Sequence, residues 1–254
     1  MRNMVIGSLL TLTIISIILV VLYRLGVYGL KSPLIKDKSS YSRYIKVVER
    51  NSTITKFIFK DENLTSKDRI KMALGKSDFI KYPKKLTILA FKNERLLEVW
   101  GYGDNHWRFI KSFNWTAYSG VLGPKLREGD RQIPEGIYGI EYLNPNSKFH
   151  LSMKVSYPNS FDREMAKLDN RDNLGGDIMI HGSNRSVGCI PIGDGGIEEL
   201  YFLVKRVGIK NVKVVISPVD FRNGGIRIKR LRHKWIERLY SDIESEVIKF
   251  KPHP

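Results

Sequence analysis

Short runs of apolar and β-branched residues dominate the chain from Lys84 onward. Gly, Pro, Asn and Asp separate these runs, as they separate the strands of antiparallel sheets. The predicted strands cover residues 86–91, 96–100, 107–110 and 212–216. A few segments with helical spacing lie between them. The pattern therefore predicts a mainly β domain of the α+β class, with a mostly antiparallel sheet and a few helices.

Three segments place apolar residues at helical spacing. Thr65 followed by Asp68 has the pattern of a capping box and predicts a short helix that ends at Gly75. Asp194 is the predicted cap of a second helix, which ends at Gly208, and a third amphipathic helix is predicted near the C-terminus. The apolar positions are Ile70, Met72 and Leu74, then Ile197, Leu200, Tyr201, Val204 and Val207, and finally Trp235, Ile236, Leu239, Tyr240, Ile243 and Val247.

The stretch from Met4 to Tyr23 is uncharged, apolar and long enough to cross a bilayer as a helix. A cleaved signal peptide has a shorter apolar region and a small-residue cleavage site, and no such site follows Tyr23. A retained signal anchor is therefore predicted in preference to a signal peptide. Basic residues on both sides of the stretch leave its orientation open.

The formal net charge of +17 raises the question of a nucleic-acid partner. Basic residues are spread through the chain, and it contains neither zinc-finger spacing nor an RNA-recognition signature, so no nucleic acid is predicted to bind. The densest basic cluster, residues 227–234, is either a contact for membrane phospholipid or an anionic polymer, or a solvated helix face.

The chain's single cysteine, Cys189, lies eight residues after His181, which closes the apolar run 178–180. A thiolate is a strong nucleophile, and imidazole is well suited to take its proton near neutral pH. The loop is therefore a candidate cysteine active site, in which Cys189 is expected to have a depressed pKa when His181 is present. The alternatives are a buried cysteine beside a core histidine, and metal ligation. One Cys and one His fall short of the four ligands of a structural zinc site, so no metal is predicted.

Glycines in this loop let the backbone approach both candidate side chains closely. Gly182 follows the histidine, Gly188 precedes the cysteine, and Ser186 belongs to the same loop. The backbone N–H groups of Gly188 and Cys189 are the predicted donors to a developing oxyanion. One such donor is worth about 3–4 kcal/mol in acyl transfer.

His181-Gly182 followed by Ser186-Val187-Gly188-Cys189 resembles the signature of the YkuD-type L,D-transpeptidases, cysteine enzymes that act on the peptide stems of peptidoglycan. Residues 129–138 are similar to the Gly-Asp-x-x-Thr-Pro-x-Gly-x-Tyr segment of that family. Four further blocks resemble its YafK-like branch in particular; they are residues 144–147, 150–152, 157–159 and 197–201. The matches together extend from about residue 84 to residue 217, so the resemblance rests on several ordered blocks.

Two departures from the family pattern concern the signature itself. The gap between His181 and Cys189 is shorter than in most of the family, and Val187 stands where a second histidine precedes the Gly-Cys pair. The YafK-like branch shares the short gap, so the difference indicates a subfamily. Gly182 offers only its backbone carbonyl to orient the His181 ring, which is a common way to hold a histidine.

The resemblance implies an L,D-transpeptidase-like β-sandwich or barrel that acts on tetrapeptide stems through a Cys189 thioester, with no cofactor. The alternative within the YafK-like branch is an L,D-carboxypeptidase or endopeptidase, a hydrolase that trims stems or releases a stem-linked lipoprotein. A third possibility is a catalytically silent, membrane-tethered protein that binds the wall. The intact His181 and Cys189 pair weighs against the third.

These inferences together predict four regions and a location. Residues 1–30 form a signal anchor or signal peptide, 31–80 a linker and small helical arm, 81–220 the catalytic domain, and 221–254 a basic amphipathic C-terminal helix. Because peptidoglycan is the implied substrate, the catalytic domain is expected in the cell envelope, on the periplasmic side of the membrane that residues 4–23 would cross. One unpaired cysteine suits that compartment, since no intramolecular disulfide can sequester it.

Several other polar residues are candidates for substrate binding. Arg185 could steady the thiolate, meet a substrate carboxylate, or be an ordinary surface arginine. His150 either lines the cleft or is a buried, hydrogen-bonded histidine. Tyr157 and Asn159 either contact substrate or build loops. The aromatic residues Trp100, Tyr102, Trp107 and Trp115 form either a sugar-stacking surface or part of the core.

Overall fold

The computed structural model describes residues 64–224 and 233–252. Eight strands form one sheet in the order β3-β2-β1-β8-β4-β5-β6-β7. The strands are β1 (Lys85–Phe91), β2 (Leu96–Gly103), β3 (His106–Asn114), β4 (Gly136–Ser147), β5 (His150–Val155), β6 (Met179–His181), β7 (Ile190–Pro191) and β8 (Val212–Ser217). The helices are α3 (Ser66–Lys76), α4 (Ser160–Leu168), α5 (Gly193–Val207) and α6 (Trp235–Val247), with short 3₁₀ turns η2 (Ile209–Asn211) and η3 (Phe221–Asn223).

The sheet is mostly antiparallel, as predicted, and the mainly β, α+β assignment is confirmed. Only the pairs β1 with β8 and β6 with β7 are parallel. Strands β3 and β7 lie at the two ends of the strand order. The resemblance implied a sandwich or barrel. In the described part of the chain, the strands form one open sheet with β3 and β7 at its ends.

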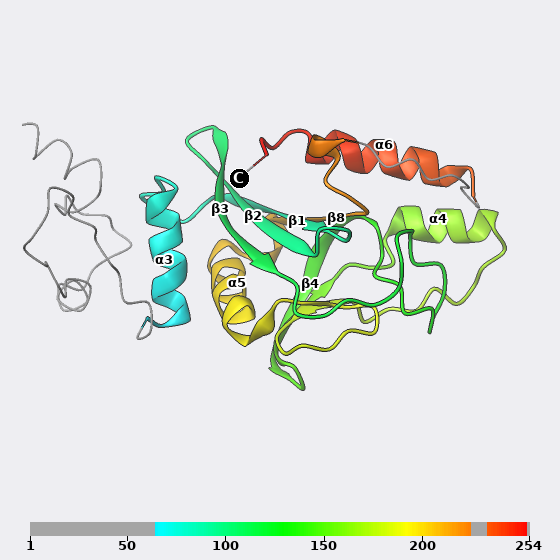
Figure 1. Cartoon of the computed structure of the whole chain (residues 1–254), viewed down its shortest axis with the longest axis horizontal. Coiled ribbons are helices and arrows are strands. Elements are labelled where there is room, and N and C mark those ends of the chain that lie inside the picture. Colours follow the sequence, from blue (N-terminus) through cyan, green and yellow to red (C-terminus); the bar gives the residue numbers. More distant parts are fainter. Residues whose placement is uncertain (1–63, 225–232, 253–254) are drawn as a thin grey trace, which may run out of the picture. The chain divides into compact units, whose positions relative to one another are not determined.

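Helices cover both faces of the central strands, which explains why β1 is buried along nearly its whole length. Leu89 and Phe91 contribute to one hydrophobic core with the buried face of α6. The alternate residues Ile88 and Ala90 point to the opposite face, where α5 contacts β1. Figure 1 shows α6 and α5 on either side of the sheet.

The three predicted helices are observed, and one predicted cap is wrong. Thr65 caps α3 by accepting a hydrogen bond from the Asp68 N–H, and Gly208 ends α5 with φ of 88°. Asp194 does not cap α5, because the helix begins one residue earlier, at Gly193. Its carboxylate Oδ1 instead accepts a hydrogen bond of 2.7 Å from the Ser183 N–H. This aspartate therefore holds the loop after His181.

The predicted helical arm packs on the rest of the domain through α3. Arg69 of α3 forms an ion pair of 2.6 Å with Glu199 of α5, and Ser66 donates a hydrogen bond to Glu198. Ile70 and Leu74 are fully buried. The arm is thus part of the same compact unit as the sheet.

Helix α6 occupies only residues 235–247 of the predicted basic segment 221–254. Ile236, Leu239, Tyr240, Ile243 and Val247 form its buried face. Acidic residues outnumber basic ones within the helix itself, so the basic character of the segment comes from residues outside the helix. The densest basic cluster precedes it, and 227–232 lie outside the described residues.

Two of the four aromatic residues, Trp100 and Trp115, belong to the core, and Tyr102 and Trp107 are partly buried. Trp100 and Trp115 are 6% and 7% exposed. Trp100 and Trp107 both contact the Phe250 ring, at centroid distances of 5.1 and 5.4 Å, and Trp107 also meets Tyr102. This cluster helps to join α6 and its C-terminal extension to the sheet.

Within residues 64–224 and 233–252, no helix combines the length and apolar character needed to cross a membrane. The predicted span at residues 4–23 and the linker at 31–63 lie outside these ranges.

Candidate active site

The parallel pairing of β6 with β7 places the predicted base and nucleophile on one face of the sheet. Ile180 pairs with Ile190, and His181 pairs with Pro191. Cys189 immediately precedes β7 and lies two residues before Pro191. Because side chains alternate along a strand, His181, Pro191 and Cys189 share a face. The register of these two short strands thus places on one face of the sheet the two residues that the signature separates by eight positions.

His181 is held in the tautomer that a general base requires. Its ring Nδ1 lies 2.5 Å from the Gly182 carbonyl oxygen. A carbonyl can only accept, so Nδ1 carries the proton and Nε2 keeps its lone pair. The Phe149 ring lies against the imidazole, with centroids 4.7 Å apart. Burial lowers the pKa of His181, opposed in part by the hydrogen bond with Gly182, so the ring is neutral at pH 7.

Only glycine fits at position 182. A Cβ there would come within 2.5 Å of the Asp194 carboxylate and 2.8 Å of the Phe149 carbonyl oxygen. Asp194 is fixed in turn by its bond to the Ser183 N–H. The carbonyl that orients His181 is therefore positioned by close packing from the β4–β5 turn and α5.

Among the described residues, the Cys189 thiol contacts a backbone carbonyl and not the His181 ring. Its Sγ donates to the Asp177 carbonyl oxygen at 3.6 Å, and no hydrogen bond joins it to His181 in the described part of the chain. Burial raises the pKa of the Cys189 thiol, and the backbone N–H of Met179 opposes this only in part. The pKa is therefore raised and not depressed as expected, because burial outweighs the Met179 hydrogen bond and the charge of Lys125.

The predicted oxyanion donors differ in availability. The Gly188 N–H donates to Ser119 Oγ at 2.7 Å, so it is not free to donate to a substrate oxygen. The Cys189 N–H makes no hydrogen bond among the described residues. Ser186 Oγ lies 2.9 Å from Ser119 Oγ and donates to the Cys189 carbonyl oxygen at 2.7 Å. Ser186 thus makes hydrogen bonds within the loop and to the connection, and the Cys189 N–H has no partner among the described residues.

Ser119 belongs to the long β3–β4 connection, residues 115–135, which lies against the cysteine loop. Thr116 is tied to both sides of that loop, since its N–H donates to the Pro191 carbonyl at 2.9 Å and its hydroxyl to the Ser183 carbonyl at 2.7 Å. Gly188 has φ of 106°, and a Cβ there would lie 3.2 Å from the Gln132 carbonyl oxygen. The glycine before the nucleophile is therefore needed for backbone shape and close approach.

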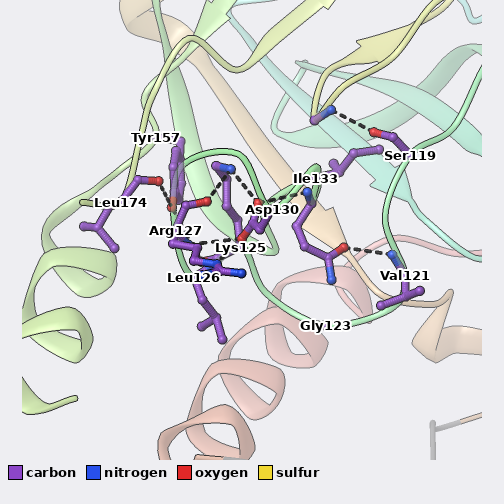
Figure 2. Close-up of polar contacts among 12 residues, drawn as sticks. Ser119, Val121, Gly123, Lys125, Leu126, Arg127, Asp130, Ile133, Tyr157 and Leu174 are labelled. Carbon is purple, nitrogen blue, oxygen red and sulfur yellow. Dashed lines mark hydrogen bonds and ion pairs between the residues drawn. The ribbon is translucent and has the colours of Figure 1, made fainter. Parts of the chain in front are cut away.

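Asp130 builds the turn inside this connection (Figure 2). Its carboxylate accepts from the Lys125 ammonium at 2.6 Å and from three backbone N–H groups, those of residues 126, 127 and 132. Burial alone would raise the pKa of Asp130, but Lys125 and the three N–H groups lower it. The block 129–138 therefore contributes to the site by shaping the connection that carries Ser119.

Two of the predicted substrate-binding residues make no contact with the base or the nucleophile among the contacts of the described residues. Arg185 is exposed and makes no hydrogen bond or ion pair among the described residues. His150 is neither buried nor directed at the thiol, since its Nε2 pairs with Glu198 of α5 at 2.7 Å. Its neighbour Phe149 is the residue that contacts His181.

Tyr157 and Asn159 serve the architecture of the fold. Tyr157 is 2% exposed, and its hydroxyl donates to the Leu174 carbonyl oxygen at 3.1 Å. Asn159 caps α4 in a reciprocal capping box with Asp162, and its side-chain amide donates to the Ile137 carbonyl. Both residues use their polar groups within the protein, which is the loop-building role considered for them.

Sequence reasoning missed Ser119, Phe149 and the Asp177 carbonyl. Ser119 lies in a loop punctuated by Gly and Pro, and nothing local distinguishes it from other loop serines. Its contact spans 69 positions in sequence. Only the three-dimensional arrangement shows its role.

The lowered pKa of His181 predicts that the acid limb of the pH–rate profile lies at a lower pH than for an ordinary histidine. The thiol proton can be accepted only by neutral imidazole, and a lowered pKa keeps the ring neutral to more acidic pH. The acid limb of kcat/KM, which reports the free enzyme, should therefore lie below about pH 6.5, the ordinary histidine value. Rates measured from about pH 4.5 to 9 check this, given that unperturbed histidine titrates near 6.5. The exposed His106→Gln control should keep the limb in place, whereas a wild-type limb at or above 6.5 contradicts the assignment.

A buried histidine base beside a cysteine at a strand end, on an open β sheet with covering helices, defines a candidate cysteine acyl-transfer enzyme. Residues 85–216 match the family model of YkuD, the L,D-transpeptidase catalytic domain. This match covers more than half of the chain, and the chain therefore belongs to the YkuD family. The resemblance inferred from the signature is confirmed.

The chain is also similar to individual proteins and solved structures. The protein named "Putative L,D-transpeptidase YafK" from Escherichia coli (strain K12) is 33% identical over 151 residues, which are 58% of this chain and 58% of the relative; the same values hold for strain O157:H7. The chain thus matches over little more than half the length of these relatives. Two crystal structures of the helical cell shape determining protein Pgp2 from Campylobacter jejuni are 22% and 20% identical, with TM-scores of 0.45 and 0.44, covering 66% and 65% of this chain and 56% and 70% of those chains.

Proposed function

We propose that the protein is an L,D-transpeptidase that acts on the tetrapeptide stems of peptidoglycan through a thioester on Cys189. Membership in the L,D-transpeptidase catalytic domain family supports the substrate class. The observation that carries the proposal is the fixed tautomer of His181. Its Nδ1 proton is committed to the Gly182 carbonyl, which leaves Nε2 as a base on the face shared with Cys189.

In the first step, Sγ leaves the Asp177 carbonyl and attacks the carbonyl carbon of the L-centre of the diamino acid. His181 Nε2 takes the thiol proton as the new S–C bond forms. The tetrahedral intermediate then expels the amine of the terminal D-residue, which takes the proton from the imidazolium. A thioester and a free D-amino acid result.

This step starts from a neutral Cys189 thiol and a neutral His181 imidazole. Burial raises the pKa of Cys189 and lowers the pKa of His181, so both shifts disfavour a resting thiolate and imidazolium. Proton transfer therefore accompanies attack on the carbonyl, when the negative charge moves from sulfur to the substrate oxygen. The unpaired Cys189 N–H is the backbone donor available to that oxygen.

In the second step, the amine of a second stem attacks the thioester carbon, the C–S bond breaks and sulfur recovers a proton. This gives a 3→3 crosslink between diamino residues. If water attacks instead, the product is a tripeptide stem. Neither route requires a metal or an organic cofactor.

The alternative is a hydrolase of the YafK-like kind, an L,D-carboxypeptidase or endopeptidase that trims stems or releases a stem-linked lipoprotein. The short loop from His181 to Cys189 favours it, since Val187 on that loop is 73% exposed. The 115–135 connection favours crosslinking, because it is hydrogen-bonded to the cysteine loop and supplies the material that a longer loop would provide. We place the transpeptidase first on that ground.

Product analysis should separate these two activities. The purified protein is expected to convert disaccharide tetrapeptide into dimers joined between diamino residues, because the 115–135 connection beside the cysteine loop would favour a bound acceptor amine over water. Mass spectrometry of the products, with and without a stem-linked peptide as acceptor, measures this. Tripeptide without dimer, or a freed lipoprotein fragment, would replace the transpeptidase by the hydrolase.

We also propose that the catalytic domain lies in the cell envelope, on the periplasmic side, with residues 4–23 as the membrane anchor. The apolar length of that segment supports the anchor. Fractionation followed by N-terminal sequencing tests it. A soluble mature protein that begins near residue 30 would exclude an uncleaved anchor.

A further inference from the structure

Two serine hydroxyls and the nucleophile's own backbone form one continuous hydrogen-bonded chain. Ser119 Oγ accepts from the Gly188 N–H at 2.7 Å and lies 2.9 Å from Ser186 Oγ. Ser186 Oγ lies 2.7 Å from the Cys189 carbonyl oxygen. Both hydroxyls are partly buried. The chain therefore begins one residue before the nucleophile and ends at the nucleophile itself.

The directions of these bonds follow from the number of protons. A carbonyl cannot donate, so Ser186 uses its single hydroxyl proton on Cys189. The proton between the two serines must then come from Ser119, whose oxygen also accepts from Gly188. The sequence of donors is Gly188 N–H, Ser119 O–H, Ser186 O–H and finally the Cys189 carbonyl. Each link polarises the next in the same direction.

This chain of hydrogen bonds engages the backbone on both sides of the amide that joins Gly188 to Cys189. The Gly188 N–H and the Cys189 C=O are both engaged, and the Cys189 N–H between them is left without a partner in the described residues. We propose that Ser119 is a positioning residue. It fixes the cysteine loop so that the Cys189 N–H, and not the Gly188 N–H, is the oxyanion donor of this loop. The proposal rests on the proposed function of Cys189.

Ser119 is itself held firmly enough for this role. Three residues before it, Thr116 is bonded to the Pro191 and Ser183 carbonyls. Two residues after it, the Val121 N–H donates to Gln132 Oε1 at 2.8 Å, and Figure 2 shows Ser119 and Val121 on this same stretch of backbone. The hydroxyl is thus anchored from both directions, as a residue that orients a reacting group must be.

The test compares Ser119→Ala, Ser119→Thr and Ser186→Ala with wild type and with Ser241→Ala, an exposed serine of α6. Two quantities are measured: kcat and KM on disaccharide tetrapeptide, and the rate of Cys189 alkylation by iodoacetamide across pH. The second needs no substrate. Ser119→Ala should lower kcat by about 10- to 100-fold with little change in KM, because the nucleophile is misplaced by an ångström or less.

Alkylation should change in the opposite sense. Once the loop is released, the thiol is less buried and its raised pKa falls toward the ordinary value, so alkylation at pH 7 becomes faster while turnover becomes slower. Ser119→Thr keeps the hydroxyl and should restore both quantities. Ser186→Ala should act like Ser119→Ala. If Ser119→Ala does not fold, the Ser186→Ala result tests whether the hydrogen-bonded serines position Cys189. Ser241→Ala should change neither.

Failure of this inference is distinct from failure of the proposed function. If wild type turns over substrate and Ser119→Ala matches or exceeds it, the Gly188 N–H serves as well as a free donor and the inference is overturned. If wild type shows no turnover but its alkylation responds to Ser119 as described, the positioning of Cys189 stands and the substrate assignment fails.

Discussion

The Cys189→Ser variant is expected to lose turnover of tetrapeptide stems by a factor of at least about 1,000, the range seen when a nucleophile is removed. An alcohol is far less acidic than a thiol, and the pKa of His181 is already lowered by burial. The neutral imidazole is therefore too weak a base to activate a serine hydroxyl. The measurement is the rate of D-amino acid release, followed by mass spectrometry of the muropeptides.

The fold should survive this change. The Sγ atom contacts the Asp177 carbonyl at 3.6 Å, and a hydroxyl can donate there as well. The melting temperature should stay within about 1–2 °C of wild type, since replacing sulfur by oxygen keeps this donor and should shift stability by less than about 0.5 kcal/mol. Serine at this position processing substrate at the native rate would remove Cys189 from the mechanism.

The strands of the central sheet could be predicted because their environment repeats locally. β1, β2, β3 and β8 all begin or end within a few residues of the predicted runs. β-branched and apolar residues fill these segments, and punctuating residues bound them. The periodicity does not show which strands pair with each other. The parallel contact of β1 with β8 joins residues more than 120 positions apart and could not be read from either segment.

The smallest elements were the hardest to predict, and they build the site. β7 consists of two residues, too few to show any period. Its pairing with β6 nevertheless places Cys189 on the face of His181. The motif identified both residues, whereas the register that unites them required the structure.

The direction of the thiol pKa could not be predicted from sequence for a similar reason. Neighbouring residue types suggested a cysteine activated by its histidine. The actual pKa depends on burial by segments distant in sequence and on which polar groups reach the sulfur. Likewise, Asp194 has the composition of a helix cap but sits one residue inside α5, where Ser183 is the nearest donor.

A buried ion pair beneath the 115–135 connection carries the second large prediction. Lys92 and Glu135 are both fully buried, with Nζ and Oε1 2.8 Å apart. The Lys92 ammonium donates its other two hydrogen bonds to the carbonyls of Gly123 and Ile133. Glu135 accepts from the Gly123 N–H and from the hydroxyl of Tyr240 on α6. The pair thus joins β1, the site-covering connection and the C-terminal helix.

Glu135→Gln should lower the free energy of unfolding by about 3–5 kcal/mol, because it leaves the Lys92 charge buried without a counter-charge. Burial already lowers the pKa of Lys92, and Glu135 is the first group that raises it again. Urea unfolding followed by fluorescence gives the change in free energy. Turnover should also fall, because Gly123 and Ile133 belong to the connection that carries Ser119.

The matched control is Lys213→Met, which breaks the exposed pair with Glu246 and should change stability by less than about 1 kcal/mol. A double variant, Lys92→Met with Glu135→Leu, removes both charges together and should recover much of the stability lost by Glu135→Gln. It leaves the Gly123 N–H and the two carbonyls without their partners, so turnover should stay low even where stability returns. Equal recovery of stability and turnover in the double variant would show that the connection does not need this pair to hold Ser119 over the nucleophile.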